Sequence, residues 1–310
     1  MKQNTDTLLM IRPVGFRMNE QTAVNNYFQE SGNELQATVN ARAQAEFDNF
    51  VSLLRDNGVA VIVADDTKEQ DTPDSVFPNN WISFHENGNA VVYPMFAENR
   101  RLERREDVLE LIEENGFVIQ DVYDYTEAED EGIFLEGTGS IILDRVNRKA
   151  YCALSERADE DLFIEFCEDL EYFPVIFNAL QTVDGARKPI YHTNVMMNVG
   201  ESFAVVCLDS IDDKKEKKNL VQHLKMDGKE IISITEEQMH RFAGNMLEIQ
   251  NKANQKLLVM SEAAFRSLNS DQISKIENYA RILYTPLPTI EKYGGGSARC
   301  MMAEIFLPKK

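Results

Sequence analysis

Apolar residues along the chain follow two patterns: short continuous runs, which are typical of buried strands, and longer stretches with helical spacing. Leu8–Ile11 and Val59–Val63 are runs of the first kind, and the second is rich in β-branched residues. Between them, residues 34–57 carry apolar side chains three or four positions apart, and Gly58 follows where a helix C-cap glycine belongs. We therefore predict a strand, a helix and a second strand over residues 8–63.

The segment 65–78 is polar and contains two prolines, which predicts a loop. From residue 81 onward one order of elements recurs: two short apolar strands joined by a turn, a helix, and a closing strand. The predicted hairpins are 81–84 with 90–93, 139–143 with 150–154, 195–199 with 203–208, and 246–249 with 256–260. The predicted closing strands are 117–119, 175–177, 230–234 and 281–284.

Helical patterns lie between each hairpin and its closing strand. The first is predicted as one continuous helix over 98–115, and the second as a helix that Ser155 caps and that ends near Tyr172. A lysine-rich stretch and residues 262–279 provide the helices of the next two units. A further short helix opens with a capping-box pattern, formed by Thr235 and Gln238.

A fifth unit is divided between the two chain ends. Cys300–Phe306 is predicted as its first strand, and residues 8–63 supply the other elements. Repeats of about 50 residues indicate a closed radial array, and joining the first and last units removes exposed sheet edges. We therefore predict an α/β fold in a single domain, 1–310: a five-bladed α/β propeller of pseudo-five-fold ββαβ units around a central pocket.

The composition excludes several classes of protein. The hydrophobic share is 43%, as in soluble globular proteins, and no apolar run approaches the roughly 18 to 20 residues of a membrane span. The N-terminal residues lack the apolar stretch of a signal peptide, and four cysteines without a C-x-x-C pair indicate a reducing, cytoplasmic location. A net charge of -20 argues against nucleic acid and anionic membranes as partners.

The candidate chemistry lies in polar residues that mark the start of each unit's first strand. These residues are separated by 56, 56, 53 and 55 positions. They are Asn80, Glu136, His192, Asn245 and Cys300. Because equivalent positions of a five-fold ring converge on its axis, a carboxylate, an imidazole and a thiol would meet in one pocket.

Cys300 follows three consecutive glycines, which let a backbone approach a ligand closely, and it is next to Arg299, a cation that would favour the thiolate. Taken alone, Cys300 could equally belong to a core strand, and His192 could be a structural histidine. Their common register with Glu136 instead predicts a nucleophile, a general acid/base and an orienting carboxylate. These three ligands are too few for a metal site, so we expect neither a metal nor a cofactor.

Five short motifs span the chain: Phe77–Trp81, Leu135–Ser140, Leu154–Arg157, His192–Asn194 and Gly294–Cys300. With these motifs the five-unit layout resembles the guanidino-group-modifying, or pentein, superfamily, which includes arginine deiminases, dimethylarginine hydrolases and amidinotransferases. The resemblance implies a pentein propeller in which Cys300 attacks the substrate's central carbon, His192 protonates the leaving nitrogen and then activates water, and Glu136 lies beside them.

The resemblance also implies substrate contacts. Arg157 would bind the α-carboxylate of an amino acid, for which a bidentate fork is suited. The basic pair at Arg100 and Arg101, with Arg101 as the candidate, could provide a second carboxylate contact or could be a solvated helix start.

Two positions depart from the superfamily's usual pattern. Where its guanidinium enzymes commonly have aspartates, this chain has Asn80 and Asn194. An amide keeps an acceptor, gains a donor and has no charge, so the pair suits a neutral ureido group better than a buried cation. With Asp74 as a further contact, the chain resembles the citrulline ureidases, which hydrolyse L-citrulline to ornithine, carbon dioxide and ammonia through a covalent thioester.

Other functions stay open at this stage. An arginine deiminase or dimethylarginine hydrolase would hold its cation with Asp74 and Glu136, whereas an amidinotransferase would need a second amine site that nothing marks. A non-catalytic pentein, like the ribosome anti-association factors, would not need Cys300 and His192 in register with Glu136. The expected partner is a small-molecule substrate, and the oligomeric state is left open. Asp65–Phe77 could be a mobile loop over the pocket or a plain connector.

Overall fold

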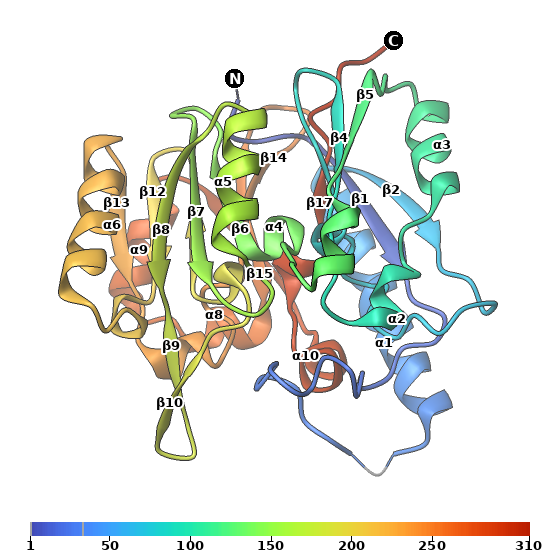
Figure 1. Ribbon diagram of the computed structural model, residues 1–310, viewed down its shortest axis with the longest axis horizontal. Coiled ribbons are helices and arrows are strands. Elements are labelled where there is room, and N and C mark those ends of the chain that lie inside the picture. The colour runs from blue at the N-terminus through green and yellow to red at the C-terminus, as the bar shows by residue number, and fades with distance from the viewer. Residues whose placement is uncertain (1, 33) are drawn as a thin grey trace.

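Five three-stranded sheets recur in the computed structural model, which describes residues 2–32 and 34–310 (Figure 1). In each sheet the first strand pairs antiparallel with the second, and the second pairs parallel with the third. The sheets are β3 (Ile82–Phe84), β4 (Asn89–Val92) and β5 (Asp121–Asp124); β6 (Ile141–Asp144), β7 (Lys149–Leu154) and β8 (Phe173–Asn178); β11 (Met197–Val199), β12 (Phe203–Val206) and β13 (Glu230–Ser233); β14 (Leu247–Gln250), β15 (Lys256–Ser261) and β16 (Arg281–Thr285); and β17 (Ala303–Glu304), β1 (Thr7–Arg12) and β2 (Ala60–Asp65).

The fifth sheet joins the two ends of the chain, as predicted. Leu9 of β1 lies opposite Ala303 of β17, and β1 pairs in parallel with β2 along its whole length. Both termini lie at the same edge of the molecule in Figure 1. The units predicted from apolar runs are therefore present as sheets, because each run supplies a strand that is buried on the core side.

The longer helices lie at the periphery and bury one apolar face, whereas α4 lies near the middle of the molecule (Figure 1). The predicted capping box of Thr235 and Gln238 is confirmed at the start of α7. The helices are α1 (Gln36–Asp56), α2 (Glu98–Arg101), α3 (Glu106–Glu114), α4 (Gly137–Ser140), α5 (Glu160–Asp169), α6 (Lys214–Met226), α7 (Glu236–Met239), α8 (Glu262–Ser267), α9 (Ser270–Glu277) and α10 (Pro288–Gly294).

The first unit departs from its prediction. The continuous helix over 98–115 is wrong, because the chain leaves the helix where Arg104 and Arg105 turn to pair with Glu129 and Asp107. The closing strand is β5 rather than 117–119, because residues 117–119 lie against the C-terminal tail: the amide of Val118 donates to the carbonyl of Pro308 at 2.9 Å.

Two more predicted boundaries are wrong. Asp159, not Ser155, caps α5, and its carboxylate accepts from the amide of Leu162 at 3.0 Å. The predicted strand Cys300–Phe306 pairs as a strand over Ala303–Glu304 alone, and it starts late because residues 298–301 form a 3-10 turn. The hairpin of β9 (Leu180–Val183) and β10 (Ala186–Pro189) and the helix α10 were not predicted.

Short helical turns precede the first strands and contact one another near the centre of the molecule. They are residues 78–80, α4, residues 193–195 and residues 298–301. Asn80 ends the first of these turns, Glu136 and His192 directly precede the next two, and Cys300 lies in the last. Within the described ranges, no helix is long and apolar enough to cross a bilayer.

Candidate active site

A small cavity lies where these turns meet. The volume open to the centre of a water molecule is about 10 Å³, so the cavity holds about one water. The cavity is lined by Asn26, Asp74, Phe77, Asn80, Arg100, Arg157, Tyr191, His192, Gly294, Gly296 and Cys300. The register read from the sequence therefore places Asn80, His192 and Cys300 around one space, with Glu136 directly behind His192.

Glu136 and His192 form a buried pair. Nε2 of His192 lies 2.7 Å from Oε2 of Glu136, while Oε1 of Glu136 accepts from the amide of Phe96 at 3.0 Å. Burial lowers the pKa of His192 to about 4 and outweighs the attraction of Glu136. Burial alone would raise the pKa of Glu136, but Arg157 and His192 hold that pKa well below its usual range. The pair is therefore a carboxylate beside a neutral imidazole at pH 7.

This pairing fixes which nitrogen of His192 carries the lone pair. A carboxylate only accepts hydrogen bonds, so the proton of the neutral ring lies on Nε2 and the lone pair lies on Nδ1. A methyl group at Gly139 would lie 2.8 Å from Nδ1 and 2.3 Å from Nδ2 of Asn80. Gly139 of the Leu135–Ser140 motif thus leaves the space that these two side chains occupy.

Cys300 is buried, and two side-chain amides point at its sulfur. Nδ2 of Asn194 donates to Sγ at 3.3 Å, and Nδ2 of Asn245 donates to Sγ at 3.2 Å. Arg299, the neighbouring cation, makes its hydrogen bonds elsewhere: it donates to the carbonyl of Met302 and pairs with Glu304 at 2.9 Å. It therefore acts on Cys300 through its charge and not through a hydrogen bond to the sulfur.

Three buried polar atoms around Cys300 have no hydrogen-bond partner among the residues that the structure describes. They are the donor Nδ2 of Asn80 and the acceptors Oδ1 of Asp74 and Oδ1 of Asn194. The opposite atom of each side chain is held: Oδ1 of Asn80 accepts from Arg100 at 2.8 Å, and Oδ2 of Asp74 accepts from Asn19 at 2.8 Å. Orphaned buried groups are costly, so this set requires a ligand or water that satisfies it.

The two adjacent arginines lie in different places. Arg100 lines the cavity, binds Glu103 through two 2.9 Å hydrogen bonds and lies 3.9 Å from Glu136. Arg101, the predicted substrate contact, does not line the cavity: it donates to the carbonyl of Met95 and pairs with Glu129 at 3.3 Å. Neighbours in the short helix α2 point about 100° apart, so only one of them can face the centre.

Arg157 is buried in the cavity wall, and its fork is occupied. Nε and Nη2 both donate to Oδ1 of Asn25, and Nη2 also donates to the carbonyl of Thr22 at 2.9 Å. Nη1 lies 3.5 Å from Glu136. The predicted carboxylate contact therefore requires Asn25 to give up its place on the guanidinium.

Asn25 belongs to residues 17–30, a segment of irregular turns that we call the cover. Its side-chain amides bind across the cavity: Asn19 donates to Asp74, and Asn26 donates to the carbonyl of Gly294 at 3.3 Å. The cover was not predicted from the sequence, because it has no apolar period and its asparagines resemble those of any loop.

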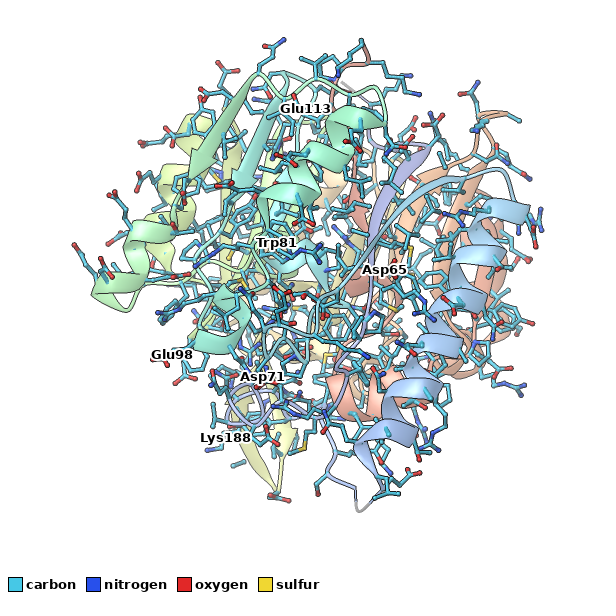
Figure 2. All side chains as sticks on the ribbon, turned by 90° about the vertical axis from the view of Figure 1, so that its right-hand side faces the viewer. Asp65, Asp71, Trp81, Glu98, Glu113 and Lys188 are labelled. Carbon is cyan, nitrogen blue, oxygen red and sulfur yellow. The ribbon has the colours of Figure 1, made fainter. Side chains whose placement is uncertain are left out.

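The segment 65–77, predicted from the sequence as a mobile loop over the pocket or a connector, is largely irregular and forms part of the cavity wall. Oδ2 of Asp66 accepts from Thr72 and Ser75 at 3.0 and 2.7 Å, and Asp74 and Phe77 line the cavity. Figure 2 shows Trp81 in the middle of the view and Asp71 below it. The exposed part around Asp71 is attached to the cover through Arg17 at 2.8 Å.

The glycine run before Cys300 gives the backbone close access to Phe77. A methyl group at Gly294 or Gly296 would lie 2.8 or 2.9 Å from the ring of Phe77, and Gly295 has φ +62. These positions therefore exclude larger residues. In the part of the chain that is described, no group of three or more His, Cys, Asp and Glu side chains is arranged to hold a metal ion.

The comparison with protein families gives one match over most of the chain. The family of eukaryotic N,N-dimethylarginine dimethylhydrolases matches residues 12–307. The chain belongs to this family. Membership confirms the predicted guanidino-group-modifying superfamily and the predicted hydrolase of carbon–nitrogen bonds. A comparison with curated protein sequences found no significant match.

Solved structures share the fold. ArgZ, an arginine dihydrolase from the ornithine–ammonia cycle in Cyanobacteria, is similar with a TM-score of 0.73 and 19% identity, over 98% of this chain and 41% of that chain. Its N-terminal domain bound to substrate has a TM-score of 0.71 and 18% identity, over 97% of this chain and 99% of that chain. A dimethylarginine dimethylaminohydrolase has a TM-score of 0.64 and 14% identity, over 97% of this chain and 100% of that chain. The chain thus spans about two fifths of full-length ArgZ and nearly all of its N-terminal domain.

Proposed function

We propose that this member of the family hydrolyses the ureido group of L-citrulline to ornithine, carbon dioxide and ammonia. The unpartnered atoms around Cys300 carry the proposal: one donor on Asn80 and one acceptor each on Asp74 and Asn194. A ureido group presents a carbonyl acceptor and N–H donors, so it can satisfy all three. A guanidinium presents donors only and would leave the amide of Asn80 without an acceptor.

The charges around the cavity also favour a neutral reacting group. Arg100 lies 4.0 Å from Asp74 and 3.9 Å from Glu136, and Arg157 lies 3.5 Å from Glu136. Burial raises the pKa of Asp74, which makes it a weaker counterion. A third guanidinium would therefore enter a dry site in which both carboxylates already face an arginine.

In the proposed reaction, Nδ1 of His192 takes the thiol proton of Cys300. The thiolate forms a bond to the ureido carbon, the bond from that carbon to the δ-nitrogen breaks, and His192 delivers its proton to the departing ornithine. His192 then takes a proton from water, whose oxygen attacks the carbamoyl thioester and releases Cys300. The carbamate product decomposes to carbon dioxide and ammonia. Each acid/base step contributes about 10²- to 10⁴-fold, and the scheme needs no cofactor.

In this scheme Arg157 binds the α-carboxylate of citrulline. A carboxylate would replace Asn25 on the same two nitrogens, Nε and Nη2, with a stronger, charge-assisted contact. Because the cavity has room for about one water, the cover must move for a substrate to enter. We therefore assign Asn25 as the group that the substrate's carboxylate displaces.

The architecture proposed with this function is a five-bladed pentein propeller in one domain, 1–310, with the cavity on its axis. Contacts of β17 with β3, of β6 with β11 and of β11 with β14 support it, because they join successive sheets. The proposed partner is a small molecule in the cytoplasm rather than nucleic acid or a membrane, which suits the net charge of -20.

The second candidate function is hydrolysis of arginine or a methylated arginine. The family match and the free Oδ1 of Asp74 favour it, because a carboxylate oxygen can hold a cationic N–H group. The similar structure ArgZ is an arginine dihydrolase. A non-catalytic role is disfavoured by the hydrogen-bonded pair of Glu136 and His192 beside a buried thiol.

An end-point assay with three substrates tests the proposal. Purified protein is incubated separately with L-citrulline, L-arginine and N,N-dimethylarginine, and ornithine, citrulline and ammonia are resolved. We expect ornithine and ammonia from citrulline and little product from the other two. Citrulline formed from arginine or dimethylarginine, with no ornithine from citrulline, would overturn the proposal in favour of the second candidate.

A further inference from the structure

Asn245 touches the sulfur that reacts, although no role was given to it from the sequence. Its Nδ2 lies 3.2 Å from Sγ of Cys300, and it converges there with Nδ2 of Asn194 at 3.3 Å. An amide nitrogen can only donate, and a thiolate is a strong acceptor, so both contacts strengthen when Cys300 loses its proton.

Arginine and histidine side chains often stabilise a cysteine thiolate in proteins, but the ones near Cys300 form hydrogen bonds with other residues. Arg299 binds Met302 and Glu304, and Nε2 of His192 binds Glu136. Cys300 is 2% exposed, so water contributes little to holding a negative charge on its sulfur. A buried anion without paired donors is costly, and among the described residues the two amides are the side chains that donate a hydrogen bond to this sulfur.

The two amides differ in how they are held. Oδ1 of Asn245 accepts from the backbone amide of Arg299 at 3.0 Å, and its Nδ2 also reaches the carbonyl of Asn194 at 3.1 Å. This orients the N–H group of Asn245 toward Sγ before any substrate binds. Oδ1 of Asn194 is unpartnered, so Asn194 has an atom left for the substrate and Asn245 does not.

We propose that Asn245 is a further catalytic residue, which stabilises the Cys300 thiolate that forms when His192 takes the thiol proton, by a fixed N–H···S hydrogen bond. The inference rests on the proposed nucleophilic role of Cys300 but not on the identity of the substrate. As the sulfur donates its electron pair to the substrate carbon it loses negative charge, so the contact with Asn245 weakens. It is restored when the thioester is hydrolysed and the thiolate leaves.

The test is the pH dependence of Cys300 alkylation by iodoacetamide, followed by mass spectrometry of the Cys300 peptide. In Asn245→Ala we expect the midpoint of the rate profile to move up by about one pH unit, and the rate at pH 7 to fall about tenfold, because a hydrogen bond to a charged group is lost. The matched control is Asn198→Ala, which removes another buried amide, one that donates to the carbonyl of Met246 rather than to Cys300.

Asn245→Asp provides a second variant that nearly preserves the shape of the side chain and the acceptor for Arg299. It loses the donor and adds a negative charge, so we expect a larger upward shift than in Asn245→Ala. Folding of each variant is checked by thermal melting. An unchanged profile in the folded Asn245 variants would overturn the inference, and so would an equal shift in Asn198→Ala. Alkylation needs no substrate, so these results are independent of whether citrulline is hydrolysed.

Discussion

The two sides of the cavity are built in different ways. One side, which we call the floor, comes from the starts of the first strands and is tied together internally. The floor consists of Glu136, His192, Asn194, Asn245 and Cys300. The other side is the cover, residues 17–30, which has no regular structure and binds the remainder of the site through side-chain amides.

The difference separates chemistry from binding. Floor side chains bind one another, so their positions are set before a substrate arrives, as catalysis by preorganised groups requires. The cover instead occupies the guanidinium that the proposed substrate would need, because Asn25 lies on the fork of Arg157. Asn19 and Thr22 hold Oδ2 of Asp74 and leave its Oδ1 free. Substitutions in the floor should therefore change kcat, and substitutions in the cover should change KM.

The largest effect is expected from Cys300→Ser. Loss of the thiolate should lower kcat by about 10³-fold or more, while the melting temperature stays near that of the parent chain. Cys207→Ser is the matched control, because the sulfur of Cys207 already lies beside the hydroxyl of Ser210 and Cys207 does not line the cavity. Full activity in Cys300→Ser would show that the floor residues do not catalyse the reaction as proposed.

Glu136→Gln should lower kcat by about 10²-fold, since a neutral amide stabilises the protonated His192 less well. The pH profile of kcat/KM tests the direction in which the charge of Glu136 shifts the pKa of His192. The pKa of His192 is about 4, so kcat/KM should be maintained at neutral pH and lost as pH falls toward that value. The charge of Glu136 raises the pKa of His192, so the acid limb of the variant should move to lower pH. Movement to higher pH would contradict the assigned pair.

Asn80→Asp tests the match to a ureido group. The variant loses the free donor, so kcat/KM for citrulline should fall by about 10²-fold, and the ratio of arginine to citrulline turnover should rise. The control is Asn79→Asp, because Asn79 is equally buried but pairs with Thr138 and does not line the cavity. A ratio that stays the same in Asn80→Asp would show that this amide does not select the substrate.

A smaller effect is expected from Asn25, and its sign depends on the replacement. Asn25→Ala removes the competitor for Arg157 and should lower KM by a few-fold, about 3- to 10-fold, while Asn25→Asp should raise KM by forming an ion pair with Arg157. In both variants kcat should change little. Equal changes of KM in the same direction would contradict the exchange of Asn25 for the substrate's carboxylate.

The sheets and the floor could be predicted because both depend on repetition along the sequence. Apolar runs supply the strands of each unit, and the register that contains Glu136, His192 and Cys300 follows from the constant spacing of those units. The helix break after Arg101 could not be predicted, since it depends on the ion pair of Arg104 with Glu129 from another part of the chain.

The side-chain contacts that could not be predicted depend on the direction in which a side chain points, rather than on its position in the sequence. Arg100 and Arg101 are adjacent in the sequence, but only Arg100 faces the cavity. Arg299 is next to Cys300 and pairs with Glu304 on another side. The cover could not be predicted because an asparagine that binds Arg157 has no local pattern that distinguishes it from a solvated one.

The central claim is that Cys300 carries a carbamoyl group taken from citrulline. The most direct measurement is an acid quench of the reaction during turnover, followed by mass spectrometry of the peptide that contains Cys300. We predict a carbamoyl adduct on Cys300 with citrulline, absent in Cys300→Ser and enriched when hydrolysis is slowed by Glu136→Gln. An adduct that forms with arginine but not with citrulline, or turnover of citrulline with no adduct on Cys300, would contradict the account.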